Sequence, residues 1–443
     1  MNESNSGEQA MKRTLRIALV ICLGLTALLF ASCAGDNAST SGTPGNEDPN
    51  NGTPGGDGAD PTTLPLLSIS ALEYQGAFRV PADTYGVSSM NYSQGPIAYH
   101  PARHSLFMVG HTYEQAIAEF GIPALVKSDS VAQLPIAGAP LQGFASILER
   151  TPNGNPQALD RIGGLAVIDG QLVVNAFEYY DAPGDNSQTT LVLKDISNLG
   201  TCAVDGFFTF QGGAGHTSGW ISPVPAVWQT ALGQTHITGQ SSGQPIISRL
   251  SVGPSAFLFD PQALLGDSPD PTAPIPTTML LDFSLDQPLH SDLANDSGSN
   301  DLWTHLSRAV YGFIVPGTRT YLTVGSSGGH DSGVCYKCEQ SDGETCGGYC
   351  APNVDDYYNY YWLWDVQEMV QVKNGERAAS ALRPYAYGIF PTPIAGAAKN
   401  ALGRGAFDPQ SGLLYLTLQG ADREQGQYAN PPVVIVYSFD GLE

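Results

Sequence analysis

The chain has 443 residues, and its 19 Lys and Arg against 42 Asp and Glu give a formal net charge of -23. This balance excludes a nucleic-acid binder, because contacts to phosphates need clustered Lys and Arg. Hydrophobic residues make up 42% of the chain, which is enough for a sizeable core and excludes wholesale disorder. With 51 Gly, 32 Pro and 20 Tyr, the composition favours turn-rich β structure over helix bundles.

The first 33 residues have the pattern of a bacterial export signal. Lys12, Arg13 and Arg16 precede an uncharged, mostly apolar run over residues 17–30, which is too short to span a bilayer comfortably. The run ends in Ala31-Ser32-Cys33, which resembles a lipobox. The resemblance implies that Cys33 is lipidated and becomes the first mature residue. The alternative is an ordinary signal peptide that is cleaved nearby.

Residues 34–65 are predicted to be a disordered tether. They are rich in Gly, Pro, Asn and Asp and contain no aromatic or basic residue, so they cannot bury enough apolar surface to become ordered. Ala34 and Gly35 follow Cys33 in place of an inner-membrane retention Asp. We therefore expect an outer-membrane lipoprotein, periplasmic or surface-exposed, that contacts the membrane through its lipid anchor only.

Two elements recur through residues 66–443, which are predicted to form one β domain. The first is a hairpin with a tight turn, which we expect at residues 97–109, 165–174, 311–324 and 406–416. The second is an apolar strand that ends in Asp, at Asp195, Asp260, Asp365 and Asp440, with residues 118–122 as a fifth copy lacking the Asp. Asp at a strand exit can cap a following helical turn.

An inner hairpin followed by an outer strand, repeated, predicts an all-β, β-propeller-like domain of about five blades. A strand over residues 72–80 is expected to complete the last blade and close the ring. The alternative is a β-sandwich with long loops.

Three segments resemble a family of secreted bacterial β-propeller-like (lipo)proteins with no assigned activity. They are residues 219–229, residues 361–376, and residues 405–409 together with 412–415. The resemblance implies a propeller fold and secretion, and it carries no catalytic residues.

Four cysteines, spaced C-x2-C-x7-C-x3-C, fall in one polar loop: Cys335, Cys338, Cys346 and Cys350. Exported cysteines usually oxidise, and a loop rich in Gly, Ser and Asp gains from cross-links. We therefore expect two disulfides, with three pairings open, and no cofactor. The alternatives are a zinc site of four thiolates, or free thiols. Three aspartates in another loop are weak candidates for calcium: Asp292, Asp296 and Asp301.

The candidate catalytic residues are His111, Tyr180, His216, His330 and Arg404. If loops from several blades bring them together at the channel, His or Tyr can move a proton while Arg404 neutralises a carboxylate. Two G-x-S-x-G matches lack the helical pattern that a nucleophile elbow needs after the serine. The aromatic stretch 355–364 is expected to pack between blades, with sugar stacking as the alternative.

The sequence therefore predicts a lipid-anchored protein that binds a glycan or a protein partner at the cell envelope. The alternative is a polysaccharide lyase or hydrolase that acts on an acidic glycan. Convergence of the histidines in one pocket would favour the enzyme, and dispersed histidines would favour the binding protein.

Overall fold

The computed structural model describes residues 60–241, 251–266, 269–396 and 399–441. Cys33 and most of the expected tether lie outside these ranges. The described part begins six residues before the expected domain boundary at residue 66. There, the N–H of Arg319 donates to the carbonyl of Pro65 (3.0 Å) and the N–H of Leu67 donates to Thr320 Oγ1 (2.8 Å).

The described residues form five antiparallel four-stranded sheets, together with two small two-stranded sheets. Each large sheet is one blade of a β-propeller, as predicted. From the innermost to the outermost strand, the first blade contains β4 (Ile97–His100), β5 (Ser105–Val109), β6 (Ile117–Gly121) and β7 (Gln142–Ala145), and the second contains β8 (Arg161–Ile168), β9 (Gln171–Phe177), β10 (Thr190–Leu193) and β11 (Val204–Phe208). The third contains β12 (Ile221–Pro223), β13 (His236–Thr238), β14 (Ala256–Phe259) and β15 (Thr278–Leu281), and the fourth contains β16 (Arg308–Ile314), β17 (Thr320–Gly328), β20 (Tyr357–Asp365) and β21 (Ala386–Ile389). The fifth contains β22 (Leu402–Asp408), β23 (Leu413–Leu418), β24 (Val433–Phe439) and β1 (Leu72–Arg79).

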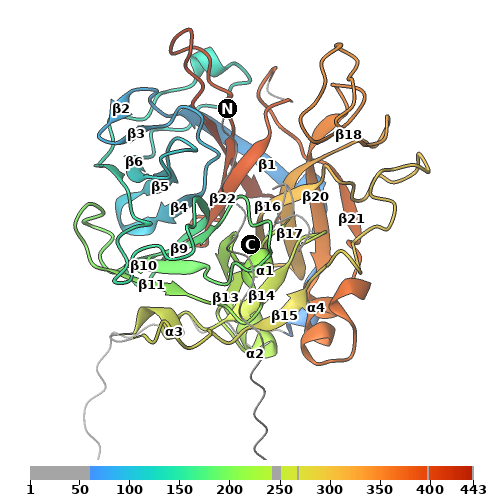
Figure 1. Cartoon of the computed structure of the whole chain (residues 1–443), viewed down its shortest axis with the longest axis horizontal. Coiled ribbons are helices and arrows are strands. Elements are labelled where there is room, and N and C mark those ends of the chain that lie inside the picture. Colours follow the sequence, from blue (N-terminus) through green and yellow to red (C-terminus); the bar gives the residue numbers. More distant parts are fainter. Residues whose placement is uncertain (1–59, 242–250, 267–268, 397–398, 442–443) are drawn as a thin grey trace, which may run out of the picture. The chain divides into compact units, whose positions relative to one another are not determined.

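The ring is closed by the N-terminal strand. The innermost strands contact one another in the cyclic order β4, β8, β12, β16, β22 and back to β4. In the fifth blade β1 pairs antiparallel with β24, so that Leu72 lies opposite Phe439. Figure 1 shows β1, in blue, beside the red C-terminal strands of this blade. Pairing between the two ends of the domain confirms the predicted ring closure.

Local sequence accounts for the turns and caps of the blades. The β8–β9 turn has Asp169 and Gly170 at φ of 49° and 73°, which is the positive-φ pair that such a hairpin needs. Each predicted strand ending in Asp is the third strand of its blade. Asp365 is the N-cap of a helix, and its Oδ1 accepts from the N–H of Gln367 (3.0 Å). Asp260 precedes the N-cap residue of another helix, and its Oδ1 accepts from the N–H of Gln262 (2.9 Å).

Short elements fill the connections. The helices are α1 (Ala214–Thr217), α2 (Ala226–Leu232), α3 (Gln262–Leu265) and α4 (Val366–Lys373), and the two small sheets pair β2 (Thr84–Tyr85) with β3 (Ser88–Ser89) and β18 (Cys335–Tyr336) with β19 (Tyr349–Cys350). None of the helices in the described ranges is long and apolar enough to cross a membrane.

The core fills the spaces between blades with aromatic and aliphatic side chains. Trp362 and Trp364 of β20 are fully buried, which confirms that most of the aromatic stretch packs inside. Trp364 Nε1 donates to Thr323 Oγ1 (3.0 Å). Near the axis the backbones approach so closely that a Cβ at Gly164 would lie 2.1 Å from the carbonyl oxygen of Gly219. Glycine is therefore required where the second and third blades meet.

The antiparallel order of strands places alternate connections on opposite faces of the ring. One face carries the starts of the innermost strands and the connections β5–β6, β9–β10, β13–β14, β17–β20 and β23–β24. We call it the mouth face, since all five innermost strands, which surround the axis of the ring, begin there. All five candidate catalytic residues are on segments at this face.

Candidate functional site

Three arginines lie at the mouth ends of three innermost strands. Arg161 begins β8, Arg308 begins β16, and Arg404 is the third residue of β22. In each strand the pairing register shifts beside the arginine, between Ile162 and Gly164, between Ala309 and Tyr311, and between Leu402 and Gly405. A β-bulge re-aims neighbouring side chains. Three blades therefore share one local feature, a β-bulge beside an arginine at the start of the innermost strand.

Arg161 has partners of its own. Its Nη1 lies 3.2 Å from Asp160 Oδ2, and its Cζ lies 4.9 Å from the centroid of the Tyr179 ring. Asp160 Oδ1 also accepts from the N–H of Tyr179 (2.7 Å). The ion pair and the cation–π contact satisfy this guanidinium within the second blade.

Arg308 and Arg404 differ, because no carboxylate pairs with either of them among the described residues. Nη1 of Arg404 is buried and has no hydrogen-bond partner there. Burial lowers the pKa of Arg308, and burial together with the charge of Arg308 lowers the pKa of Arg404 to about 9. Two neighbouring cations that are removed from water without a counterion are unfavourable. A bound anion would relieve this cost, which makes the pair a candidate anion site.

A small pocket opens onto this site between the first, second and fifth blades. Its volume is about 20 Å³, which is room for about one water molecule. The residues that line it include Arg161, Arg404, Gln94, Gln115 and Phe177. One oxygen of a carboxylate fits this space, whereas a whole sugar ring does not. A larger ligand would place one carboxylate oxygen in the pocket and its remainder on the mouth face.

Glu178, which directly follows β9, is the acid with the most perturbed surroundings near this site. Partial burial and the nearby carboxylates of Asp181, Asp160 and Asp185 raise the pKa of its side chain. A carboxyl group that keeps its proton to higher pH can serve as a general acid.

The predicted histidines are dispersed. His111 Nδ1 lies 3.1 Å from Glu114 Oε2 in the β5–β6 connection, and His216 Nδ1 lies 2.6 Å from Asp282 Oδ1 at the third blade. The pocket at the arginines is lined by neither of them.

His330 is hydrogen-bonded at the fourth blade. Its Nε2 lies 2.8 Å from Ser327 Oγ, and its Nδ1 lies 2.9 Å from the carbonyl oxygen of Asn300. Ser327 is the central serine of one G-x-S-x-G match and has the contact of a nucleophile with its base. However, only 1% of it is exposed, and it lies in strand β17. Both ring nitrogens of His330 are therefore used inside the fold.

Of the five predicted catalytic residues, only Arg404 lines the small pocket at the arginines. Tyr180 is 64% exposed in the β9–β10 connection, outside that lining. Sequence reasoning missed Arg161 and Arg308. Their signal was an arginine at the start of an innermost strand, one or two residues before Gly or Ala, in a chain with few basic groups.

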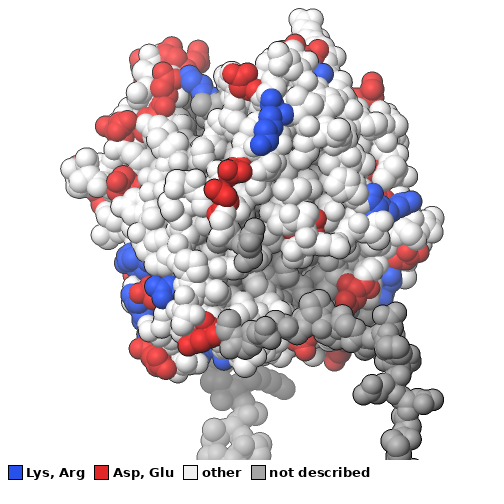
Figure 2. Space-filling model, turned by 180° about the vertical axis from the view of Figure 1, so that it is seen from behind, with Lys and Arg blue, Asp and Glu red and all other residues white. Residues whose placement is uncertain are grey.

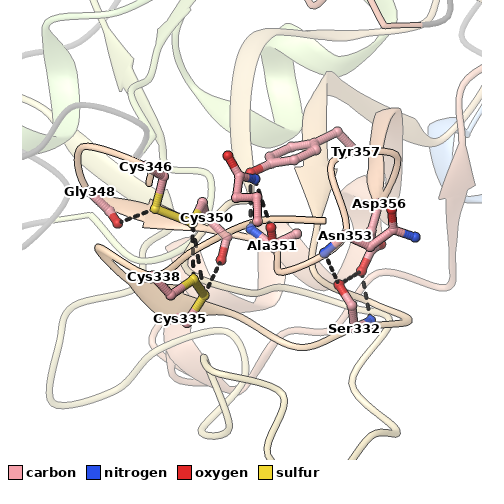
Figure 3. The surroundings of a disulfide bond; sticks show 11 residues. Ser332, Cys335, Cys338, Cys346, Gly348, Cys350, Ala351, Asn353, Asp356 and Tyr357 are labelled. Atoms are coloured by element: carbon pink, nitrogen blue, oxygen red, sulfur yellow. Dashed lines mark hydrogen bonds between the residues drawn. A yellow bond between two sulfur atoms is a disulfide. The ribbon is translucent and has the colours of Figure 1, made fainter. Parts of the chain in front are cut away.

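The cysteine loop joins β17 to β20 on the mouth face. It contains two disulfides, Cys335–Cys338 and Cys346–Cys350, in agreement with the prediction of two disulfides. Figure 3 shows the four cysteines together with Ser332 and Asp356, which lie near the two ends of the loop. Asp356 Oδ2 accepts from both the N–H and the hydroxyl of Ser332 (2.8 Å each). Cys202, the remaining described cysteine, is half-buried and unpaired.

Potential metal ligands gather at one place in the described ranges. The Sγ atoms of Cys335, Cys338 and Cys350 lie within 4.8 Å of one another, and no other group of three His, Cys, Asp or Glu there meets this distance. Asp292 instead accepts the N–H groups of Asp296 and Ser297 (2.9 and 3.0 Å), and Asp301 accepts the hydroxyl of Tyr387 (3.0 Å). The three aspartates therefore do not form a common site.

On the side of the molecule seen in Figure 2, small acidic and basic groups are separated by wide uncharged areas. That side has no extended basic surface of the kind that nucleic acids need.

Two solved structures are similar to this chain. One is the catalytic domain of a GH62 α-L-arabinofuranosidase from Coprinopsis cinerea, with 13% identity and a TM-score of 0.34, covering 83% of this chain and 98% of that one. The other is the α-L-arabinofuranosidase PaAbf62A from Podospora anserina in complex with cellotriose, with 11% identity and a TM-score of 0.34, covering 86% and 99%. No protein-family model and no curated protein matches the chain. At these identities and TM-scores the likeness carries no conclusion about activity.

Proposed function

We propose that this protein is an exported lipoprotein whose propeller binds the carboxylate of an acidic glycan at the mouth of its central channel. The observation that carries the proposal is the neighbouring pair Arg308 and Arg404, two half-buried arginines that lack a carboxylate partner among the described residues, with Nη1 of Arg404 fully buried. Guanidinium groups bind carboxylates through two parallel hydrogen bonds, which makes Arg well suited to this recognition.

A glycan fits the remainder of the mouth face better than a protein partner does. The pocket admits one oxygen of a charged group and leaves the rest of the ligand outside. Exposed tyrosines stand on mouth-face connections of several blades, among them Tyr92, Tyr113, Tyr180 and Tyr428. Aromatic side chains combine a large apolar face with a polar tip, which suits the mixed surface of a sugar.

Calorimetric titration of the full-length protein in detergent with galacturonate and with galactose tests the proposal. We expect binding of the acid and none of the neutral sugar, with an affinity that falls as salt is added, because the contact is ionic. Equal affinity for both sugars, or no binding of either one, would contradict the proposal.

A second candidate function is hydrolysis of the same glycan. The observation that favours it is the raised pKa of Glu178, to which the nearby carboxylate of Asp160 contributes. In this reaction Glu178 gives its proton to the leaving glycosidic oxygen, while Asp160 accepts a proton from the water that attacks the anomeric carbon. One C–O bond breaks and another forms. New reducing ends in the titration mixtures, made with an oligomeric acid, would identify an enzyme.

The lipid anchor has its own test. When the full-length chain is expressed in a bacterium, we expect it to incorporate labelled palmitate and to partition with membranes. Cys33→Ser removes the thiol that carries the lipid, so the label should be lost. Cys22→Ser, in the apolar run of the signal, is the matched control and should keep the label. Labelled Cys33→Ser protein would refute the anchor.

A further inference from the structure

We propose that Tyr92, His111 and Tyr113 form an aromatic platform that binds a neutral sugar residue next to the acidic one. This inference rests on the proposed function and names the class of glycan. Tyr92 is 54% and Tyr113 80% exposed. The centroid of the His111 ring lies 5.4 Å from that of Tyr92 and 5.5 Å from that of Tyr113, so the three rings form one cluster.

Hydrogen bonds fix the backbone that carries the platform. The N–H of His111 donates to Ser89 O (2.8 Å), and the N–H of Tyr113 donates to His111 Nδ1 (3.2 Å). Tyr92 has a positive φ of 54°, and its N–H donates to Asn430 Oδ1 (3.0 Å) from the fifth blade. An uncommon backbone conformation that is kept in place by contacts from another blade is typical of functional surfaces. Rings that are already ordered lose little entropy when a ligand binds.

Two short segments connect the platform to the small pocket at the arginines. Tyr92 precedes Gln94 by two residues, and Tyr113 precedes Gln115 by two residues, and both glutamines line the pocket. Gln115 Nε2 donates to the carbonyl of Thr112 (2.7 Å), and Gln115 Oε1 accepts from the N–H of Ile162 (2.6 Å). One buried side chain thus connects the turn that carries the platform to the innermost strand that begins with Arg161.

The charge beside the platform selects the kind of sugar. Glu114 has a side chain that is 43% exposed, and its Oε2 lies 3.1 Å from His111 Nδ1 and accepts from Ser88 Oγ (3.2 Å). A carboxylate there accepts hydrogen bonds from sugar hydroxyls but repels a second carboxylate. The neighbouring residue of the ligand is therefore neutral, and the glycan combines uronic acid with neutral sugar.

Three probes separate the parts of this proposal in titrations of the full-length protein: a monomeric uronate, a diuronate, and an aldobiouronate in which the uronate is linked to a neutral hexose. We expect the aldobiouronate to bind on the order of tenfold more tightly than the monomer, and the diuronate to show no such gain. Tyr113→Ala should abolish the gain and leave the affinity for the monomer unchanged. Tyr336→Ala, an exposed tyrosine of the cysteine loop, is the control and should retain the gain.

Each result has a separate meaning. If the wild type binds none of the probes, the arginine site is refuted and the platform with it. If the monomer binds but the aldobiouronate gains nothing, or if Tyr113→Ala keeps the gain, the platform is refuted while the arginine site stands. If the diuronate gains as much as the aldobiouronate, the ligand is not a mixed glycan, and the assignment of a neutral neighbour is wrong.

Discussion

Arg404→Met should make the protein more stable and at the same time unable to bind an acidic ligand. The arginine has a buried Nη1 without a hydrogen-bond partner and lies next to the charge of Arg308. Methionine keeps much of the side-chain volume and removes a half-buried charge that has no counterion among the described residues, so the free energy of unfolding should rise by about 1 kcal/mol. Affinity for galacturonate should fall about 30-fold or more, since a charge-assisted contact is lost.

Chemical denaturation and calorimetric titration measure the two effects. Arg423→Met is the matched control, since it removes the same charge from an exposed position in the β23–β24 connection. It should change neither stability nor affinity by much. A destabilised Arg404→Met protein that still binds galacturonate would show that the arginine serves packing alone.

The same arginine predicts a pH dependence of binding. Burial, with the charge of Arg308, lowers the pKa of Arg404 to about 9. Only the protonated guanidinium attracts an anion, so the affinity of the wild type should fall as the pH rises through this value.

Glu119→Ala should destabilise the first blade more than any substitution at its surface. Glu119 lies in β6, has no exposed side-chain surface, and accepts hydrogen bonds from donors along the whole blade: His100 Nδ1 (2.9 Å), Arg103 Nη1 (2.8 Å), Ser105 Oγ (2.6 Å) and Gln142 Nε2 (2.7 Å). Alanine leaves these donors without their acceptor, including the charged Arg103. We expect a loss of about 3–5 kcal/mol in the free energy of unfolding.

Acid should weaken the same network. Burial alone would raise the pKa of Glu119, but its hydrogen bonds and the charge of Arg103 outweigh burial and lower this pKa below its ordinary value of 4.5. Its contribution is therefore fully present above that pH and is lost as the pH falls through the lower, folded value. Unfolding curves of Glu119→Ala should lack this acid-dependent part. Glu73→Ala, on the exposed side of β1, is the control, and an equal loss of stability there would contradict the interpretation.

Turns and helix caps are the features that local sequence predicts best in this chain. Asp169-Gly170 specifies its hairpin because both positions tolerate positive φ, and the strands ending in Asp were recognisable because their caps lie within two residues. The hairpin of the third blade escaped notice, since α2 is inserted between β12 and β13 and interrupts the pattern. Glu119 was passed over as part of an incomplete repeat, although a lone charge in an apolar strand often marks a buried network.

The sequence by itself determined the repeated strand pattern, the propeller class, the closing strand and the cysteine loop, because these depend on periodicity and on spacing along the chain. It also named Arg404. Only the tertiary structure decided that Arg404 stands with Arg308 near the channel without a carboxylate, and that the three histidines are separated and bonded within their own parts of the fold. Strands that are far apart in the chain meet at the axis, and this distance in sequence is why neighbours there cannot be read from local pattern.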